Sequence, residues 1–298
     1  MSVERARSEA GPARPERPVS VVPEFDDVPG DAPPDESRAG ALYRSQRHRL
    51  IALGTIAALL VVWHMLPTLR LVNPLVMPTP FATLEALADL VSTGIIFGHF
   101  GLTMFEIGVG YAIGVTMGFV IGAALATLET LRRVMAPYIL ALQSLPKVVL
   151  APLMIAWLGF GVESKIATAV AICFFPLMIN TMVGLQLTRP DATKLMVALG
   201  ASRRQIFTKL QLPTALPLIF VGLKHSLLLA FTGALVAEIL VGSSAGLGRL
   251  VQVFNAQIAM DYAFAVVVVV AGLAVSFVVL FDALDRRIIF WRHAEEGL

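Results

Sequence analysis

Ionisable side chains inside long apolar runs are the residues of this chain whose chemistry stands out. Lys147 follows Pro146 in LPKVVLAPLMIAWLGFG, and Glu238 lies in AEILVGSSAGLG. Charged groups are costly inside a membrane, so they mark solute paths or paired sites there. A lysine beside such a path lowers the cost of an anion entering a low-dielectric region. Lys147 and Glu238 are therefore candidates for lining a translocation path.

Each of these side chains also has a purely structural interpretation. Lys147 could serve helix packing or pair with a carboxylate, and Glu238 could cap the glycine-rich stretch that follows it. Other ionisable groups in apolar runs have similar alternatives, namely a place near the membrane interface or, for the lysine, pairing with a carboxylate. They are Glu106, His64, Lys224 and His225.

Residues for other kinds of chemistry are missing or wrongly spaced. A phosphate-binding loop needs Gly-x4-Gly-Lys-Ser/Thr between a strand and a helix, but the segment from Gly159 to Lys165 has Ser164 at the second glycine position. The five histidines are scattered, and a net charge of +2 is too small to indicate nucleic-acid binding. We therefore expect no enzymatic activity, no cofactor, no metal site and no nucleic-acid partner.

The composition is that of an integral membrane protein. Mean hydropathy is +0.78, with 57% hydrophobic and 15% charged residues. Residues 1–45 differ, because they are dense in Pro, Glu, Asp and Arg and contain too few large apolar side chains to form a core. We expect a disordered cytoplasmic tail over 1–45 and a membrane domain over 46–298.

Six apolar stretches approach or exceed the roughly 20 residues that a helix needs to cross a bilayer. They are residues 50–66, 102–128, 136–158, 166–187, 216–241 and 262–285. Residues 78–100 carry polar residues at helical spacing and predict a short helix at the membrane surface. Five prolines, at 146, 152, 176, 213 and 217, are expected to break or bend the later spans.

The basic residues predict the orientation of these spans, because cytoplasmic loops carry an excess of Lys and Arg. With the N-terminus inside, thirteen such residues fall on the cytoplasmic side, and only Arg70, Lys165 and Arg249 fall on the other. Both termini and the loop over 189–215 are thus predicted to be cytoplasmic. The glycine-rich segment 242–248 is predicted to be an outward re-entrant loop.

The second span carries a glycine at every fourth position. A helix places such residues on one face, where the backbone of a neighbouring helix can approach closely. These helix-packing candidates are Gly110, Gly114, Gly118 and Gly122.

Residues 189–215 predict a charged helix-turn-helix between two spans. Pro190 and Asp191 suit the start of a first helix, which Gly200 ends. Ser202 and Gln205 form a capping box for a second helix, and Leu212-Pro213 is expected to end it. The pair could dock a partner protein, rest on anionic lipid headgroups or simply connect two spans.

The residue order from Gly200 to Leu212-Pro213, with Pro217 following, resembles the EAA loop of ABC importer permeases. The stretches LPKVVLAPLMIAWLGFG, FFPLMINTMVGLQ and AEILVGSSAGLG are also similar to that family, nearest its sulfonate, taurine, nitrate and bicarbonate branch. The resemblance implies a type I importer permease that pairs with a second copy or a paralogue. Two ABC ATPase subunits and a periplasmic or lipid-anchored substrate-binding protein are its implied partners.

The resemblance also implies which residues would couple to the ATPase. They are Lys194, Ala198, Gly200, Ala201, Ser202, Arg203, Arg204, Leu212 and Pro213. The chain departs from the family where Glu-Ala-Ala is usual, because Lys194, Leu195 and Met196 stand there. A polar contact made by the family's glutamate is therefore not carried over.

We thus expect an all-α integral membrane protein with six transmembrane helices, a core over about 100–288 and a cytoplasmic coupling loop at 189–215. Its expected role is the permease subunit of an ABC importer in a bacterial inner membrane, surrounded by membrane lipid. The expected substrate is a small anion such as a sulfonate, nitrate or bicarbonate. The alternatives are a pyrimidine-type vitamin precursor carried by the same family, an ion-coupled secondary transporter, or a scaffold that only recruits a cytosolic partner.

Overall fold

The computed structural model describes residues 38–242 and 245–289, with side chains from residue 50 onward. It consists of two units, residues 1–58 and 59–298, and each is described by itself. Helix α1 (Arg38–Thr68) begins in the first unit and ends in the second. Most of the predicted tail over 1–45 lies outside the described residues. The described apolar side chains of α1 from Leu50 to Val62 are exposed, as expected of a helix that meets lipid.

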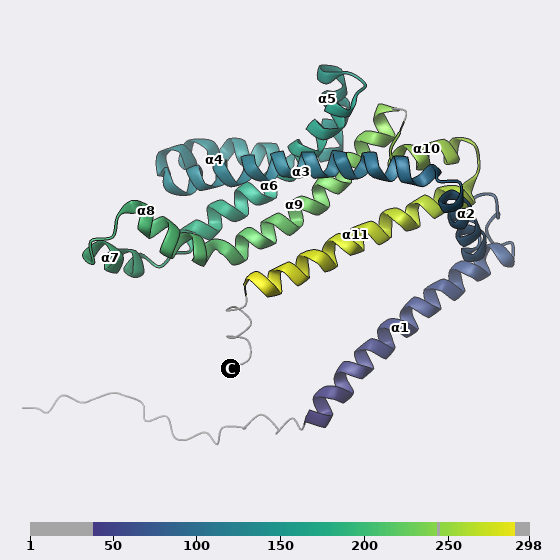
Figure 1. Ribbon diagram of the computed structural model, residues 1–298, viewed down its shortest axis with the longest axis horizontal. Coiled ribbons are helices and arrows are strands. Elements are labelled where there is room, and N and C mark those ends of the chain that lie inside the picture. Colours follow the sequence, from purple (N-terminus) through teal and green to yellow (C-terminus); the bar gives the residue numbers. More distant parts are fainter. Residues whose placement is uncertain (1–37, 243–244, 290–298) are drawn as a thin grey trace, which may run out of the picture. The chain divides into compact units, whose positions relative to one another are not determined.

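The described residues of the second unit form helices and turns. The long helices α3, α6 and α9 lie side by side, and α11 runs beside α9 (Figure 1). The elements after α1 are α2 (Pro80–Ser92), α3 (Ile95–Thr127), α4 (Glu129–Ser144), the 3-10 turn η1 (Lys147–Val149), α5 (Leu150–Leu158), α6 (Val162–Gln186), α7 (Pro190–Ala198), α8 (Arg203–Ile206), the π-helical turn η2 (Phe207–Gln211), α9 (Leu212–Val241), α10 (Leu247–Ala256) and α11 (Met260–Ile288).

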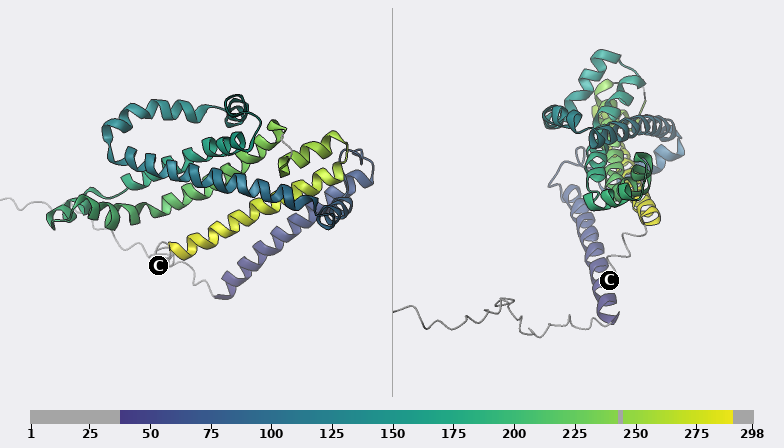
Figure 2. Two further views of the ribbon diagram at one scale, coloured as in Figure 1. Left: turned by 45° about the horizontal axis from the view of Figure 1, so that its top comes forward. Right: turned by 90° about the vertical axis from the view of Figure 1, so that its left-hand side faces the viewer.

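Five helices in the described part of the chain are long and apolar enough to cross a membrane, and a bent pair supplies a sixth crossing if it is counted as one span. That pair is α4 with η1 and α5, which meet at 86° within the predicted span 136–158. The bend lies at Leu145, whose extended backbone is what a following proline favours. Figure 2 shows α4 turning back over α3 before the bend.

Helices α3 and α6 run parallel along the predicted glycine stripe. Gly110 lies opposite Ala169, Gly114 opposite Cys173, Gly118 opposite Leu177 and Gly122 opposite Thr181. In each of these four pairs, the residue of α6 stands 59 positions after the glycine of α3. A Cβ on Gly118 would lie 2.8 Å from the Phe174 carbonyl oxygen, so the two backbones approach more closely than other residues would permit.

We expect Gly118→Val to lower the free energy of unfolding by about 2 kcal/mol, because the added side chain meets backbone atoms of α6 that cannot rotate away. Gly108→Val is the matched control, since it has the same change on the same helix with nothing within 4 Å of its Cβ. Thermal unfolding in detergent, followed by tryptophan fluorescence, measures both. Equal midpoints for the two variants would contradict the expected contact.

Helix α9 runs antiparallel to α6 and completes the core. Gly184 of α6 faces Ala215 near the start of α9, and Gly233 near its end faces Ala169. Small and apolar side chains from the three helices fill the space between them, and Cys173 is buried there as a free thiol. Every one of these helices therefore has a face that close packing holds against its neighbours.

Helices α2 and α10 pack against α11 at one end of the second unit, the end opposite α7 and α8 (Figure 1). We call this the distal end. Helix α2 supplies the short helix predicted within 78–100, and Thr79 caps it by accepting the Ala82 N–H. The Tyr262 hydroxyl of α11 donates to Asp89 of α2 at 2.9 Å. Helix α10 was not predicted, because residues 242–248 indicated only a re-entrant loop; residues 243–244 lie outside the described part.

Candidate functional site

The predicted coupling segment forms two short helices, α7 and α8, between the end of α6 and the start of α9 (Figure 1). Pro190 occupies the first turn of α7, where its missing N–H costs nothing. Gly200 has a φ of 76°, a left-handed conformation that reverses the chain after α7. Ser202 and Gln205 then form a reciprocal capping box: the Ser202 N–H donates to Gln205 Oε1 at 2.8 Å, and the Gln205 N–H donates to Ser202 Oγ at 3.3 Å.

The prediction that Leu212-Pro213 ends the second helix is wrong. The chain passes from α8 through η2 into α9 without a break, because the π-helical turn shifts the hydrogen-bond pattern by one residue. The Leu212 N–H donates to the Phe207 carbonyl, five residues back, and Pro213 then lies in the first turn of α9, where no N–H is needed. As a result, α8 is joined directly to α9.

The surface of α7 and α8 combines exposed apolar and basic side chains. Leu195, Val197 and Leu199 are 61%, 59% and 74% exposed, and Arg203 and Arg204 are exposed beside them. A cluster of this kind suits a contact with another protein or with anionic lipid headgroups. Lys194 lies 3.3 Å from Asp191 on its own helix, and both side chains are exposed.

The remaining predicted coupling residues lie around this surface. Ala198 is exposed at the end of α7, and Ala201 is half-buried in the turn. Leu212 and Pro213 are half-buried at the start of α9. The structure thus brings the predicted set together at one end of the bundle, the end opposite α10.

A large apolar groove lies between α3, the α4–α5 bend and α6. Its volume is about 830 Å³, and its walls include Met117, Leu145, Trp157 and Phe174. Among the described residues that line it, Glu163 is the only charged one. Such a surface suits a partner helix or a solute with an apolar body.

The two predicted path residues lie elsewhere. Lys147 is half-buried on η1 at the α4–α5 bend and is not among the described residues that line the groove. Glu238 is fully buried near the end of α9 and does not line the groove either. The interpretation in which Glu238 caps the following glycine-rich stretch matches its contacts, described below. His64 and His225 are exposed.

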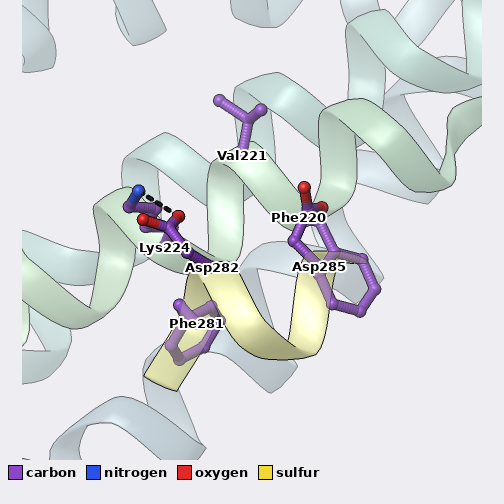
Figure 3. A pocket seen from close by; sticks show the side chains of 6 residues that line it. All are labelled: Phe220, Val221, Lys224, Phe281, Asp282 and Asp285. Carbon is purple, nitrogen blue, oxygen red and sulfur yellow. Dashed lines mark hydrogen bonds and ion pairs between the residues drawn. The ribbon is translucent and has the colours of Figure 1, made fainter. Parts of the chain in front are cut away.

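Lys224 pairs with a carboxylate across two helices. Its Nζ lies 2.5 Å from Asp282 Oδ1 of α11, with both side chains partly exposed. Figure 3 shows this pair at the edge of a small cavity of about 120 Å³ between α9 and α11. The residues that line it are Phe220, Val221, Lys224, Phe281, Asp282 and Asp285.

A buried ion pair at the distal end was not foreseen. Lys165 was assigned to an outer loop, but α6 begins at Val162, so Lys165 lies inside it with 0% exposure. Its Nζ lies 2.7 Å from Glu106 Oε1 of α3, also fully buried, and it donates to the Ala245 carbonyl at 3.1 Å. Within the described residues, Glu106 Oε2 has no hydrogen-bond partner.

Glu238 lies beside this pair and binds the start of α10. Its Oε2 accepts the Gly248 N–H at 2.7 Å, and its Oε1 accepts the Thr103 hydroxyl at 2.5 Å. Thr103 in turn accepts the Leu247 N–H at 2.9 Å. One carboxylate thus holds two backbone N–H groups of α10, the first directly and the second through a hydroxyl.

His99 completes the contacts of this segment. Its Nδ1 accepts the Gly246 N–H at 3.0 Å. Four buried or half-buried side chains thus bind residues 245–248, namely His99, Thr103, Lys165 and Glu238, and Glu106 pairs with Lys165 beside them. Glu106 and Glu238 stood out in the sequence only as single charges in apolar runs, and their shared site depends on how α3, α6 and α9 pack.

Comparison with known proteins decides the family. The model of the binding-protein-dependent transport system inner membrane component matches residues 114–290, more than half of the chain. The chain belongs to this family. The permease is 31% identical to a putative aliphatic sulfonates transport permease of Bacillus subtilis, over 81% of this chain and 87% of the relative. It is also 31% identical to the taurine transport system permease of Escherichia coli, over 84% and 92%.

A formylaminopyrimidine transport permease of Halalkalibacterium halodurans is 30% identical, over 78% of the permease and 92% of the relative. Among solved structures, the methionine ABC transporter MetNI in inward-facing conformations matches with a TM-score of 0.56 at 19% identity, covering 64% of the permease and 95% of that chain. These matches show the type I importer fold and a place near the sulfonate, taurine and nitrate branch. The permease is a multi-pass inner-membrane subunit of an ABC importer.

Proposed function

We propose that α7 and α8 receive the movement of an ABC ATPase subunit and pass it to the membrane helices. The observation that carries this proposal is the direct joining of α8 to α9 through η2, since a displacement of α8 must move α9. Exposed Arg203 and Arg204 suit acidic groups on the ATPase. Two ATPase subunits and a second permease, identical or paralogous, would complete the importer.

The proposed orientation places the coupling helices and both termini in the cytoplasm. The burial of Lys165 inside α6 strengthens the charge asymmetry, because it leaves only Arg70 and Arg249 of the Lys and Arg residues first assigned to the outer side. The distal end would then face outward, where a substrate-binding protein arrives. We assign residues 46–298 to the permease domain, with its core over about 100–288.

The groove between α3, the α4–α5 bend and α6 is proposed as this subunit's half of the translocation path, closed by the second permease. Exposed apolar side chains also occur on α4, on η1 and in the turn after α5, where Tyr138 is 61%, Val149 61% and Phe160 78% exposed. A surface of this kind is expected to be covered in the assembled importer. Movement of the α4–α5 bend relative to α3 and α6 would change the width of the groove.

The proposed substrate is a small organic solute. An apolar groove with one carboxylate offers little to a strongly hydrated ion such as nitrate or bicarbonate, whereas it suits a solute with a carbon body. The sulfonate relatives make an alkanesulfonate the first candidate, and the formylaminopyrimidine relative makes a pyrimidine the second. Lys147, which favoured an anion of any kind, sulfonates included, is not among the described residues that line the groove.

Reconstitution of the complex purified from its own membrane tests this function. We expect an ATPase to co-purify and labelled alkanesulfonate or pyrimidine to enter vesicles only with ATP, at least tenfold faster than nitrate. Uptake should survive collapse of the proton gradient. Uptake that needs the gradient and not ATP would instead support an ion-coupled carrier, and faster uptake of nitrate would contradict the proposed substrate class.

A further inference from the structure

Glu238 acts as a helix cap supplied from a neighbouring helix. The cap position of α10 is Gly246, which has no side chain to bind the free N–H groups of the first turn. Glu238 of α9 replaces that side chain by binding Gly248 directly and Leu247 through Thr103.

The glycines of this segment make the close approach possible. A Cβ on Gly248 would lie 2.7 Å from the Leu235 carbonyl oxygen, and a Cβ on Gly246 would collide with the Glu238 carboxyl group. Any larger residue at either position would push α10 away from α9. The motif AEILVGSSAGLG therefore encodes one unit, in which Glu238 and the two glycines serve the same contact.

Helix α9 connects this contact to the coupling helices. Glu238 lies in its last turn, and α8 joins its first turn through η2 (Figure 1). Lys165 fixes the Ala245 carbonyl to α6, the other helix that leads to the coupling segment. A displacement of α10 would thus act on both helices, because hydrogen bonds fix its start to α9 and the residue before it to α6.

We propose that Glu238 is a positioning residue of the transport cycle: by fixing α10 to α9, it lets the arrival of the substrate-binding protein at the distal end stimulate the ATPase at the other end. This inference rests on the proposed function. It concerns the mechanical connection between the two ends and assigns to Glu238 no contact with the solute.

The test uses the complete importer, reconstituted with the substrate-binding protein of the same transport system. We expect Glu238→Gln to reduce the ratio of stimulated to unstimulated ATPase rate at least fivefold, because the amide cannot accept both the Gly248 N–H and the Thr103 hydroxyl. The binding-protein concentration for half-maximal stimulation should stay within twofold. Hydrogen exchange should accelerate at least tenfold in residues 246–250 and remain unchanged in 166–178.

Three variants of threonine separate this role from general stability. Thr103→Val removes the hydroxyl with little change of shape and should lower the stimulation ratio at least threefold, whereas Thr103→Ser keeps the hydroxyl and should stay within twofold of wild type. Thr116→Val is the matched control, since that exposed hydroxyl binds only the Ala112 carbonyl of its own helix. Stimulation ratios within twofold of wild type for Glu238→Gln and Thr103→Val, or equal loss in Thr103→Ser, would overturn the inference.

Failure of the proposed function gives a different result. In that case wild type itself would co-purify with no ATPase, and the inference would fall with it. If wild type is stimulated and the variants respond alike, only the role of Glu238 is refuted.

Discussion

Replacing Lys165 by Met should lower the free energy of unfolding by about 3–5 kcal/mol, the usual cost of removing one partner from a buried ion pair. Lys165 and Glu106 are both fully buried, so the variant leaves a carboxylate with neither its counter-charge nor water. The Ala245 carbonyl also loses the Lys165 ammonium as a donor. Chemical unfolding in detergent and the yield of monodisperse protein measure the effect.

Two further variants show whether the lost pair is the cause. The double variant Glu106→Gln with Lys165→Met removes both charges and should recover most of the stability, to within about 2 kcal/mol of wild type. Lys224→Met is the matched control, because that lysine pairs with Asp282 at a partly exposed site, and its loss should cost under about 1 kcal/mol. Equal effects of Lys165→Met and Lys224→Met would show that burial of the first pair contributes nothing.

Gly200→Pro should reduce ATP-driven uptake at least about 100-fold while the protein still inserts and folds. Proline fixes φ near −65°, whereas Gly200 has a φ of 76°, and it removes the N–H that donates to the Val197 carbonyl at 2.9 Å. The turn between α7 and α8 must therefore reorganise, and the surface proposed for the ATPase is lost. Uptake into vesicles and the amount of co-purified ATPase are the measurements.

Gly94→Pro is a control with the same local geometry. Gly94 also has a φ of 76°, and its N–H also donates to a carbonyl three residues back, but it lies between α2 and α3, away from the coupling helices. We expect its ATPase to remain bound. Loss of the ATPase from both variants would mean that backbone strain at any turn disrupts the complex, and the specific role of Gly200 would fail.

The glycine stripe of α3 could be predicted from the sequence, but its pairing with α6 could not. Four-residue spacing predicts the packing face of α3, and Glu106 lies on that same face, four residues before Gly110. Lys165 likewise lies four residues before Ala169, but nothing in the sequence reveals the offset of 59 residues that pairs the two helices. The ion pair is a property of helix register, which only the packed structure contains.

Two predictions, the start of α6 and the helix end at Pro213, were wrong because the local sequence was ambiguous. The predicted span began only at residue 166, whereas α6 begins at Val162, so Lys165 was placed on the outer side rather than in the interior. Pro213 looked like a helix end, because a π-helical turn that removes the need for its N–H has no recognisable sequence pattern. The capping box at Ser202 could be predicted, since both of its partners lie within four residues.

The constant offset between α3 and α6 determines which parts of the permease are able to move. If α6 slid by one turn along α3, Lys165 would lie beside Gly110, and Glu106 would be buried opposite Gly161, without its counter-charge. The free-energy cost of burying Glu106 without its counter-charge opposes this sliding, so α3 and α6 are expected to move as one rigid body. We therefore expect alternating access to come from rotation of this body as a whole and from bending at the break between α4 and α5, at Leu145 and Pro146.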